Sequence, residues 1–219
     1  MKFAVIVFPG SNCDHDAYHV LKQLSIDVSF VWHKEKDLSH YDGILIPGGF
    51  SYGDYLRTGA IARFSPIMES VVNESKKGKI VLGICNGFQI LVESGLLPGA
   101  LIINNTVKFI SKDVTLNVQT NKSIFTNCID KGKKLVMPIA HKEGNYIANQ
   151  DIVKQLEDQD RILFRYDDNP NGSIHDIAGI INEKGNVLGM MPHPERAAEE
   201  LLGSNDGSFI FKSILSSYV

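Results

Sequence analysis

The chain carries the sequence KIVLGICNGFQ at residues 79–89, where an apolar run ends in a cysteine between two glycines. The run Lys79–Gly83 predicts a strand buried on both faces, and Phe88–Ser94 predicts a helix that follows almost at once. Glycines two positions before and after Cys85 permit a sharp strand-to-helix turn, because side chains there would collide. Such a turn presents the Cys85 thiol at the carboxyl edge of a sheet, where the helix N-terminus favours its ionised form.

The sequence before this stretch predicts an α/β fold. Solid apolar runs at Phe3–Phe8, Val28–Trp32 and Gly43–Ile46 indicate further strands of a parallel sheet. Helical patterns lie between the strands at Asp14–Leu24 and Tyr55–Lys76. Strand–helix alternation with right-handed crossovers gives an open doubly wound, mostly parallel sheet flanked by helices.

The second half of the chain predicts mainly strands and turns, with one closing helix. We therefore expect a single domain over residues 1–219, in which a mixed or antiparallel extension continues the sheet. The expected elements are strands at Val107–Phe109, Val114–Val118, Lys134–Ile139, Ile162–Tyr166, Ala178–Asn182 and Val187–Met191, and a helix at Ser208–Ser217.

Composition restricts the class of protein. The 219 residues are 43% hydrophobic and 21% charged, as in ordinary globular proteins. A net charge of -3 provides no polycationic surface, so we expect no nucleic-acid partner. The apolar run Phe3–Phe8 is too short to span a membrane and is not followed by a signal-peptide cleavage site. Three cysteines (Cys13, Cys85 and Cys128) match neither a disulfide framework nor a zinc pattern, so a reducing cytoplasm is expected.

A histidine and a glutamate late in the chain are suited to activate the cysteine. His193-Pro194-Glu195 follows the predicted strand Val187–Met191, and Pro194 favours an extended segment. In such a segment His193 and Glu195 face the same side. A carboxylate beside an imidazole fixes its tautomer and leaves the other nitrogen free to take a thiol proton. Alone, the tripeptide is weak evidence and is also compatible with a solvated turn, and Cys85 alone is also compatible with a small buried core residue.

A pair of glycines follows the strand Gly43–Ile46. Gly48-Gly49 allow backbone N–H groups to point into a pocket, as an oxyanion hole requires. The predicted donors are the amides of Gly49 and of Asn86, the residue after the nucleophile. An ordinary turn explains the glycines equally well without Cys85, and a phosphate loop is excluded because no G-x-x-x-x-G-K-[ST] is present.

One further cluster, Cys13-Asp14-His15-Asp16, resembles a set of metal ligands. Consecutive residues that open a helix diverge around it, and no distant ligand set stands out in the sequence. We therefore expect no metal on this chain, and interpret the aspartates as an acidic helix start.

These segments together resemble the class I glutamine amidotransferases, with their G-x-C-x-G-x-Q elbow, Gly-Gly oxyanion loop and late His-x-Glu. Among them, the chain is most similar to the family of glutaminase subunits of phosphoribosylformylglycinamidine synthases, and the resemblance runs from Phe3 to the C-terminal helix. It rests on FPGSNCD (8–14), PGGFSYGDYLR (47–57), GICNGFQ (83–89), GLLPGAL (95–101) and HPER (193–196).

The resemblance implies a reaction and a set of partners. The family converts formylglycinamide ribonucleotide, glutamine and ATP to the amidine, glutamate, ADP and phosphate in purine biosynthesis, and this chain would supply only ammonia. ATP and Mg²⁺ would bind to a separate large synthetase subunit, often joined by a small bridging subunit, with no cofactor on this chain. This agrees with the lack of a nucleotide-binding motif in the sequence.

The resemblance also implies glutamine contacts. They would come from Gln89, from Gly48, and from two loops that contain Thr106, Val107 and His141. At the position of Lys142 the family usually has glycine, so this chain departs from the family pattern in the second loop. His141 is interpreted as structural rather than catalytic, because His193 already supplies the base.

Three other functions fit parts of the sequence. A cysteine hydrolase or chaperone of the related elbow-bearing superfamily would typically have histidine where this chain has Asn86. A non-enzymatic module on the same fold would be expected to lack a triad residue, and none is missing. An amidotransferase of another biosynthetic pathway is disfavoured by the SYGDYLR and ICNGFQ segments.

Overall fold

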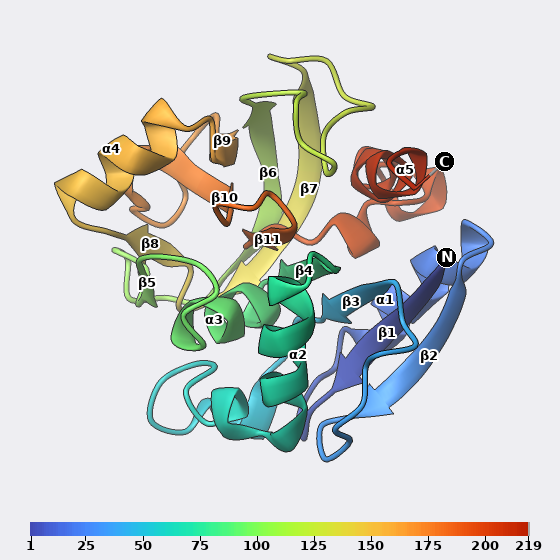
Figure 1. The fold of residues 1–219 in the computed structure, drawn as a ribbon. Coiled ribbons are helices and arrows are strands. Elements are labelled where there is room, and N and C mark those ends of the chain that lie inside the picture. Colours follow the sequence, from blue (N-terminus) through green and yellow to red (C-terminus); the bar gives the residue numbers. More distant parts are fainter. Residues whose placement is uncertain (219) are drawn as a thin grey trace.

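The computed structural model describes residues 1–218 and is organised around a nine-stranded sheet of order β2-β1-β3-β4-β11-β10-β9-β6-β7 (Figure 1). The first five strands in this order are parallel, and β10, β9, β6 and β7 continue the sheet antiparallel. The parallel strands are β1 (Lys2–Val7), β2 (Asp27–Trp32), β3 (Gly43–Ile46), β4 (Ile80–Ile84) and β11 (Val187–Met190). The antiparallel strands are β6 (Ile110–Val118), β7 (Lys134–His141), β9 (Ile162–Tyr166) and β10 (Ile177–Ile181), and β5 (Ala100–Ile102) pairs with β8 (Asn145–Ile147) in a second sheet.

Helices cover both faces of the parallel strands. The chain steps from β1 to β2 in one direction and from β3 to β4 in the other, so right-handed crossovers place α1 (Asp14–Gln23) and α2 (Pro66–Lys76) on opposite faces. Figure 1 shows α2 and α3 (Asn86–Glu93) in front of the sheet. The other helices are α4 (Gln150–Asp158), at the antiparallel end, and α5 (Ser208–Ser216).

Burial follows the hydrophobic pattern of the strands. Every residue of β3 and β4 is buried, because helices cover both faces there. Strand β7 instead alternates, with Leu135, Met137 and Ile139 buried and Val136 exposed. The predicted doubly wound sheet with an antiparallel extension is therefore confirmed.

Two predicted elements are wrong. The helix expected over Tyr55–Lys76 begins only at Pro66, and the residues from Tyr55 to Pro66 form turns and one short 3-10 segment, Ala62–Phe64. Proline is tolerated in the first turn of a helix but disfavours a helical residue before it, so Pro66 starts α2. Val107–Phe109 is not a strand, because Val107 has a φ of 59° in a surface turn.

Two strands and one α-helix were not predicted. The two short strands β5 and β8 pair only with each other, and the helix α4 carries few apolar residues. The sequence does contain one indication of α4, because asparagine is a preferred N-cap residue. The Asn149 side chain caps the helix by accepting a hydrogen bond from the Ile152 amide at 2.8 Å. None of the helices in residues 1–218 combines the length and apolarity that a membrane span requires.

Candidate active site

Cys85 lies in a strained turn between β4 and α3. Its φ of 50° and ψ of -104° are unusual for a residue with a side chain, as the predicted elbow requires. The Cys85 amide donates to the carbonyl of Met190 on β11 at 2.8 Å, and its carbonyl accepts from Gln89 at 3.2 Å. The turn is therefore fixed to the neighbouring strand on one side and to the first helical turn on the other.

The two flanking glycines allow β4 and α3 to pack closely. A Cβ atom on Gly83 would lie 2.8 Å from the carbonyl carbon of Gly87. A Cβ atom on Gly87 would overlap the carbonyl oxygen of Ile46 on β3. Real Cβ atoms do not approach so closely, so glycine is required at both positions for this elbow.

His193 and Glu195 reach the elbow from the end of β11. The His193 amide donates to the carbonyl of Pro138 on β7 at 2.9 Å, which fixes the backbone beside the sheet. Its Nδ1 lies 2.6 Å from Oε1 of Glu195, and both side chains are buried. The expected extended segment is replaced by a 3-10 turn at Pro194–Arg196, yet the pair forms.

The charge state of His193 is set by competing effects. Burial lowers the pKa of the imidazole, but Glu195 and the thiols of Cys85 and Cys13 together raise it well above its ordinary value. Nε2 is buried and has no hydrogen-bond partner within residues 1–218. A protonated imidazole beside a cysteine is the partner that a thiolate nucleophile needs.

A cavity of about 170 Å³ opens beside these residues, at the carboxyl ends of the parallel strands. The rings of Phe50 and Phe109 lie 6.4 Å apart at an angle of 30° in its lining, and both are about half exposed. The lining consists of Asn12, Cys13, Gly49, Phe50, Cys85, Phe109, Ala140, His193 and Arg196.

The predicted oxyanion donors belong to backbone next to this cavity. Gly49 lines it with a φ of 141°, and a Cβ atom there would lie 2.8 Å from the Asn12 amide nitrogen. Asn86 is the first residue of α3, so its amide has no acceptor within the helix. The Asn86 side chain also accepts from the Ser51 amide at 3.2 Å, which joins the glycine loop to the elbow.

Gly48 is constrained by the side chains of His193 and Cys85. A Cβ atom on Gly48 would lie 2.7 Å from Cε1 of His193 and 3.4 Å from Cβ of Cys85. Gly48 therefore lies against the side chains of His193 and Cys85, as we expect of a residue in the glutamine pocket.

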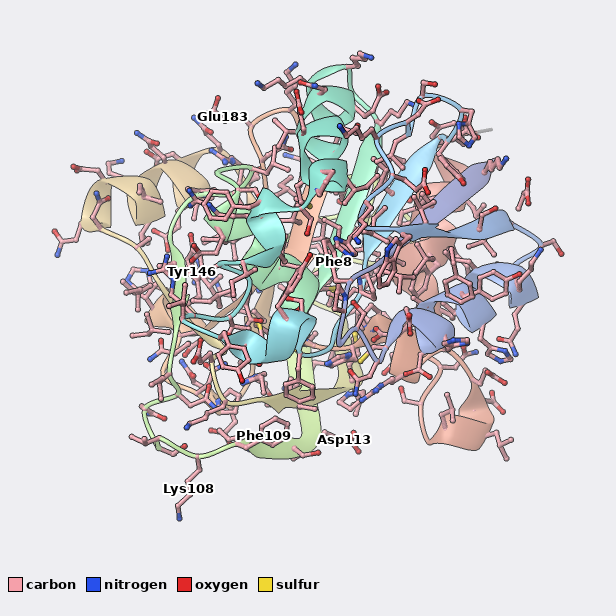
Figure 2. All side chains as sticks on the ribbon, turned by 90° about the horizontal axis from the view of Figure 1, so that it is seen from below. Phe8, Lys108, Phe109, Asp113, Tyr146 and Glu183 are labelled. Carbon is pink, nitrogen blue, oxygen red and sulfur yellow. The ribbon has the colours of Figure 1, made fainter. Side chains whose placement is uncertain are left out.

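The remaining predicted glutamine contacts are placed differently. Gln89 is buried with its amide engaged, accepting from Asn86 at 3.0 Å and donating to the carbonyl of Glu143 at 2.5 Å. Thr106 and Val107 are exposed and lie outside the lining, and Figure 2 shows their neighbour Lys108 pointing outward. Only Phe109 of this segment lines the cavity.

His141 is a buried residue at the end of β7. Its Nδ1 lies 3.2 Å from Oδ1 of Asn104. Burial, assisted by the charge of His193, lowers the pKa of His141 to about 4, so the ring is neutral. A neutral histidine fixed in this way fits the structural role predicted for it.

Six residues of the lining were not predicted from the sequence, and two of them carry a thiol or a charge. Cys13 and Arg196 both line the cavity, and Nη2 of Arg196 donates to Sγ of Cys13 at 3.2 Å. Nε of Arg196 also donates to Asp16 at 3.0 Å. Cys13 and Arg196 both lie in sequence motifs that carry the family resemblance. Their contact joins residues far apart in the chain, so no local sequence pattern could have predicted it.

Comparison with known proteins shows similarity along almost the whole chain. The family model for the CobB/CobQ-like glutamine amidotransferase domain matches residues 1–207. The structure of PurLQS from Thermotoga maritima is similar at 48% identity and a TM-score of 0.93, over 100% of this chain and 99% of that chain. A glutamine amidotransferase from Thermotoga maritima shares the fold at 15% identity and a TM-score of 0.59, over 100% of this chain and 82% of that one.

Proposed function

The chain belongs to the CobB/CobQ-like glutamine amidotransferase family, and we propose that it is the glutaminase subunit of a phosphoribosylformylglycinamidine synthase. The resemblance predicted from the sequence is confirmed by the family match and by the similarity to PurLQS. The chain is therefore a glutamine amidotransferase. The mechanism proposed below rests on one observation, the strained Cys85 turn beside the buried His193–Glu195 pair.

The geometry supports a thioester mechanism. The Cys85 thiolate attacks the side-chain amide carbon of glutamine, and the developing oxyanion accepts hydrogen bonds from the amides of Gly49 and Asn86. Protonated His193 gives its proton to the leaving nitrogen, so ammonia departs and a glutamyl thioester remains on Cys85. His193 then takes a proton from water, whose oxygen attacks the thioester and releases glutamate and the thiolate.

Glu195 acts through His193. Its carboxylate holds Nδ1 at 2.6 Å, which directs Nε2 toward the substrate and stabilises the imidazolium. Since burial opposes a charged imidazole, the carboxylate offsets a desolvation cost that would otherwise deprive the leaving group of its proton.

We place the second half of the reaction on partner subunits. Ammonia would pass to a large synthetase subunit that binds ATP, Mg²⁺ and formylglycinamide ribonucleotide, with a small bridging subunit between them. The similarity to PurLQS over the full length of both chains supports this assignment. No cofactor is assigned to this chain, because the thiolate, imidazole and backbone amides account for its half-reaction.

Partner binding would act on the glycine loop. Residues 51–58 follow Gly48-Gly49 and contain four residues with positive φ, namely Tyr52, Gly53, Asp54 and Leu56. Leu56 is 93% exposed and Tyr55 is 73% exposed, although both are large and hydrophobic. An exposed apolar segment of this kind suits contact with a partner protein.

A chain of hydrogen bonds connects this segment to the elbow at both of its ends. At one end, the Ser51 amide donates to Asn86, and Asn86 donates to Gln89 at 3.0 Å. At the other end, Oγ1 of Thr58 donates to the Glu143 carboxylate at 2.5 Å, and the Glu143 carbonyl accepts from Gln89. Ser51 follows Gly49 by two positions, so we propose that a shift of residues 51–58 acts on the Gly48–Gly49 peptide through the backbone, which glycine allows at low steric cost.

We expect an electrophilic glutamine analogue to label Cys85 with a stoichiometry of one. Peptide mass mapping should find Cys85 modified and Cys13 and Cys128 free, because only Cys85 is placed between the imidazole and the oxyanion donors. Excess glutamine should protect Cys85. Equal labelling of the three thiols, or labelling mainly at Cys13 within the same cavity, would contradict the assignment.

His193→Ala should abolish thioester formation, with a loss on the order of 10⁶-fold in kcat, and Glu195→Gln should cost less, on the order of 10⁴-fold. With the carboxylate removed, burial dominates and the pKa of His193 falls. The alkaline limb of the pH profile should therefore move to lower pH in Glu195→Gln. An unchanged alkaline limb, or greater damage from Glu195→Gln than from His193→Ala, would invalidate the assigned roles.

The isolated chain should hydrolyse glutamine poorly, and the synthetase should activate it. Thr58→Val removes one charge-assisted hydrogen bond at similar side-chain volume, so about tenfold of the partner-dependent gain in kcat should be lost. Ammonium-dependent turnover of the complex should stay constant and serves as the control. Full glutaminase rates from the isolated chain, or complete activation of Thr58→Val, would exclude this route.

A further inference from the structure

A second cavity lies at the opposite end of the sheet from Cys85. Its volume is about 580 Å³, which is within the range of small-molecule sites. Strands β4 and β11 begin beside it, because the end of α2 and the turn Asn182–Lys184 line it, whereas Cys85 and His193 follow the other ends of the same strands. Figure 2 shows this separation, with Glu183 of the second cavity near the top and Phe109 of the active site near the bottom.

One wall of this cavity is a sequence motif that the active site does not use. Gly95–Gly99 opens the GLLPGAL segment, which carries part of the family resemblance, and all five residues line the cavity. Tyr146 on β8 holds this wall, because its Oη donates to the carbonyl of Pro98 at 2.8 Å. A Cβ atom on Gly99 would lie 2.5 Å from the same Oη, so glycine is required for this contact. The wall is therefore fixed in place.

Arg161 is a buried cation in the lining of this cavity. Its side chain is 8% exposed, and burial lowers the pKa of the guanidinium. Nε donates to the carbonyl of Ile181 at 3.0 Å and Nη1 donates to Gln159 at 3.3 Å, but Nη2 has no hydrogen-bond partner within residues 1–218. Its ion pair with Glu183 is long, at 3.8 Å, and the Glu183 side chain is 81% exposed. A buried guanidinium in this state lacks a close anion.

Two lysines add positive charge at the rim of the cavity. Nζ of Lys184 donates to the carbonyl of Lys76 at 2.7 Å, so these residues are neighbours, and Lys184 follows Glu183 directly. Three of the lining side chains are cationic and one is anionic, which leaves a net charge of +2. The remaining lining includes apolar side chains from α3, the Gly95–Gly99 wall and α4, namely Val92, Leu96, Leu97, Pro98, Ile152 and Leu156.

We propose that this cavity binds a phosphate monoester, with the phosphate on Arg161 and the organic part of the ligand against Leu96 and Leu156. A guanidinium presents paired N–H donors that match phosphate oxygens. A phosphate monoester carries a charge close to about -2 at pH 7, which balances the charge of the lining, whereas a monocarboxylate would leave half of it uncompensated. The two lysines would act as point charges at the rim.

The charge match makes binding depend on pH and salt. The second pKa of a phosphate monoester is about 6, so affinity should rise as the pH is raised through this value and the dianion forms. Added salt should weaken binding, because it screens the rim charges.

The test is calorimetry on the full chain with adenosine monophosphate (AMP), inorganic phosphate and adenosine as probes. AMP should bind at one site per chain with a dissociation constant below about 1 mM. Inorganic phosphate should bind more weakly, because it lacks an apolar part, and adenosine should not bind detectably.

Variants separate this site from general attraction of anions. Arg161→Met should weaken AMP binding by about tenfold or more, and Lys184→Met should weaken it less, because its charge lies at the exposed rim. Lys108→Met is the matched control. It removes one positive charge from an exposed residue near Phe109, at the other end of the molecule in Figure 2, and should bind AMP like the unmodified chain.

Several outcomes would overturn the site. These are no saturable binding of AMP, unchanged affinity in Arg161→Met, or lost affinity in Lys108→Met. Succinate, a dianion without phosphate, should bind more weakly than inorganic phosphate, and tighter binding of succinate would contradict the phosphate assignment. If Arg161→Met does not fold, because Nε also supports the end of β10, unchanged affinity in Lys184→Met would refute the site in its place.

This inference does not rest on the proposed function. Because the two cavities lie at opposite ends of the sheet, AMP should not protect Cys85 from an electrophilic glutamine analogue, whereas glutamine should. Protection by AMP would place it in the active site and overturn the second site. Failure of Cys85 to react at all would contradict the glutaminase mechanism and leave AMP binding unaffected.

Discussion

The strained backbone of Cys85 is the constraint on which the rest of the site depends. A residue with a side chain adopts a φ of 50° together with a ψ of -104° only where the surrounding structure enforces it. Here the enforcement comes from the hydrogen bond between the Cys85 amide and the Met190 carbonyl, and from Gly83 and Gly87, which let α3 approach β4 and β3. The same hydrogen bond ties the elbow to β11, the strand that leads to His193. One turn therefore aims the thiol and sets its distance from the base.

Burial of the His193–Glu195 pair strengthens the electrostatic interactions of this site. Taking an imidazolium and a carboxylate out of water is costly, and only their short contact and the adjacent thiols compensate for it. In the mechanism we propose, the proton on Nε2 is held in a small cavity, where it would act strongly on the charge that develops on the substrate. The nearby His141 is kept neutral by burial, so it does not compete for that proton.

Features encoded locally were predictable from the sequence, and features that depend on distant contacts were not. The elbow, the buried strands and the Gly48-Gly49 loop follow from residue types at short spacing. The helix over Tyr55–Lys76 was misplaced because Pro66 restricts the backbone before it. Gln89 and the Asn105–Phe109 segment were assigned by resemblance, and the engagement of Gln89 with Glu143 joins positions 54 residues apart. The contact between Cys13 and Arg196 joins positions 183 residues apart, so no local pattern predicts it.

We propose that Cys85 makes ammonia and does nothing for the reaction that consumes it. Cys85→Ala in the assembled enzyme tests this claim with two steady-state assays, one supplied with glutamine and one with ammonium chloride at raised pH. The account predicts almost complete loss of glutamine-dependent amidine formation and retained turnover with ammonium, since free NH₃ replaces the delivered molecule. Cys85→Ser should behave almost like alanine, because a neutral hydroxyl lacks the nucleophilicity of a thiolate. Equal loss in both assays would contradict the account, since it would mean that Cys85 supports the synthetase site or the assembly itself.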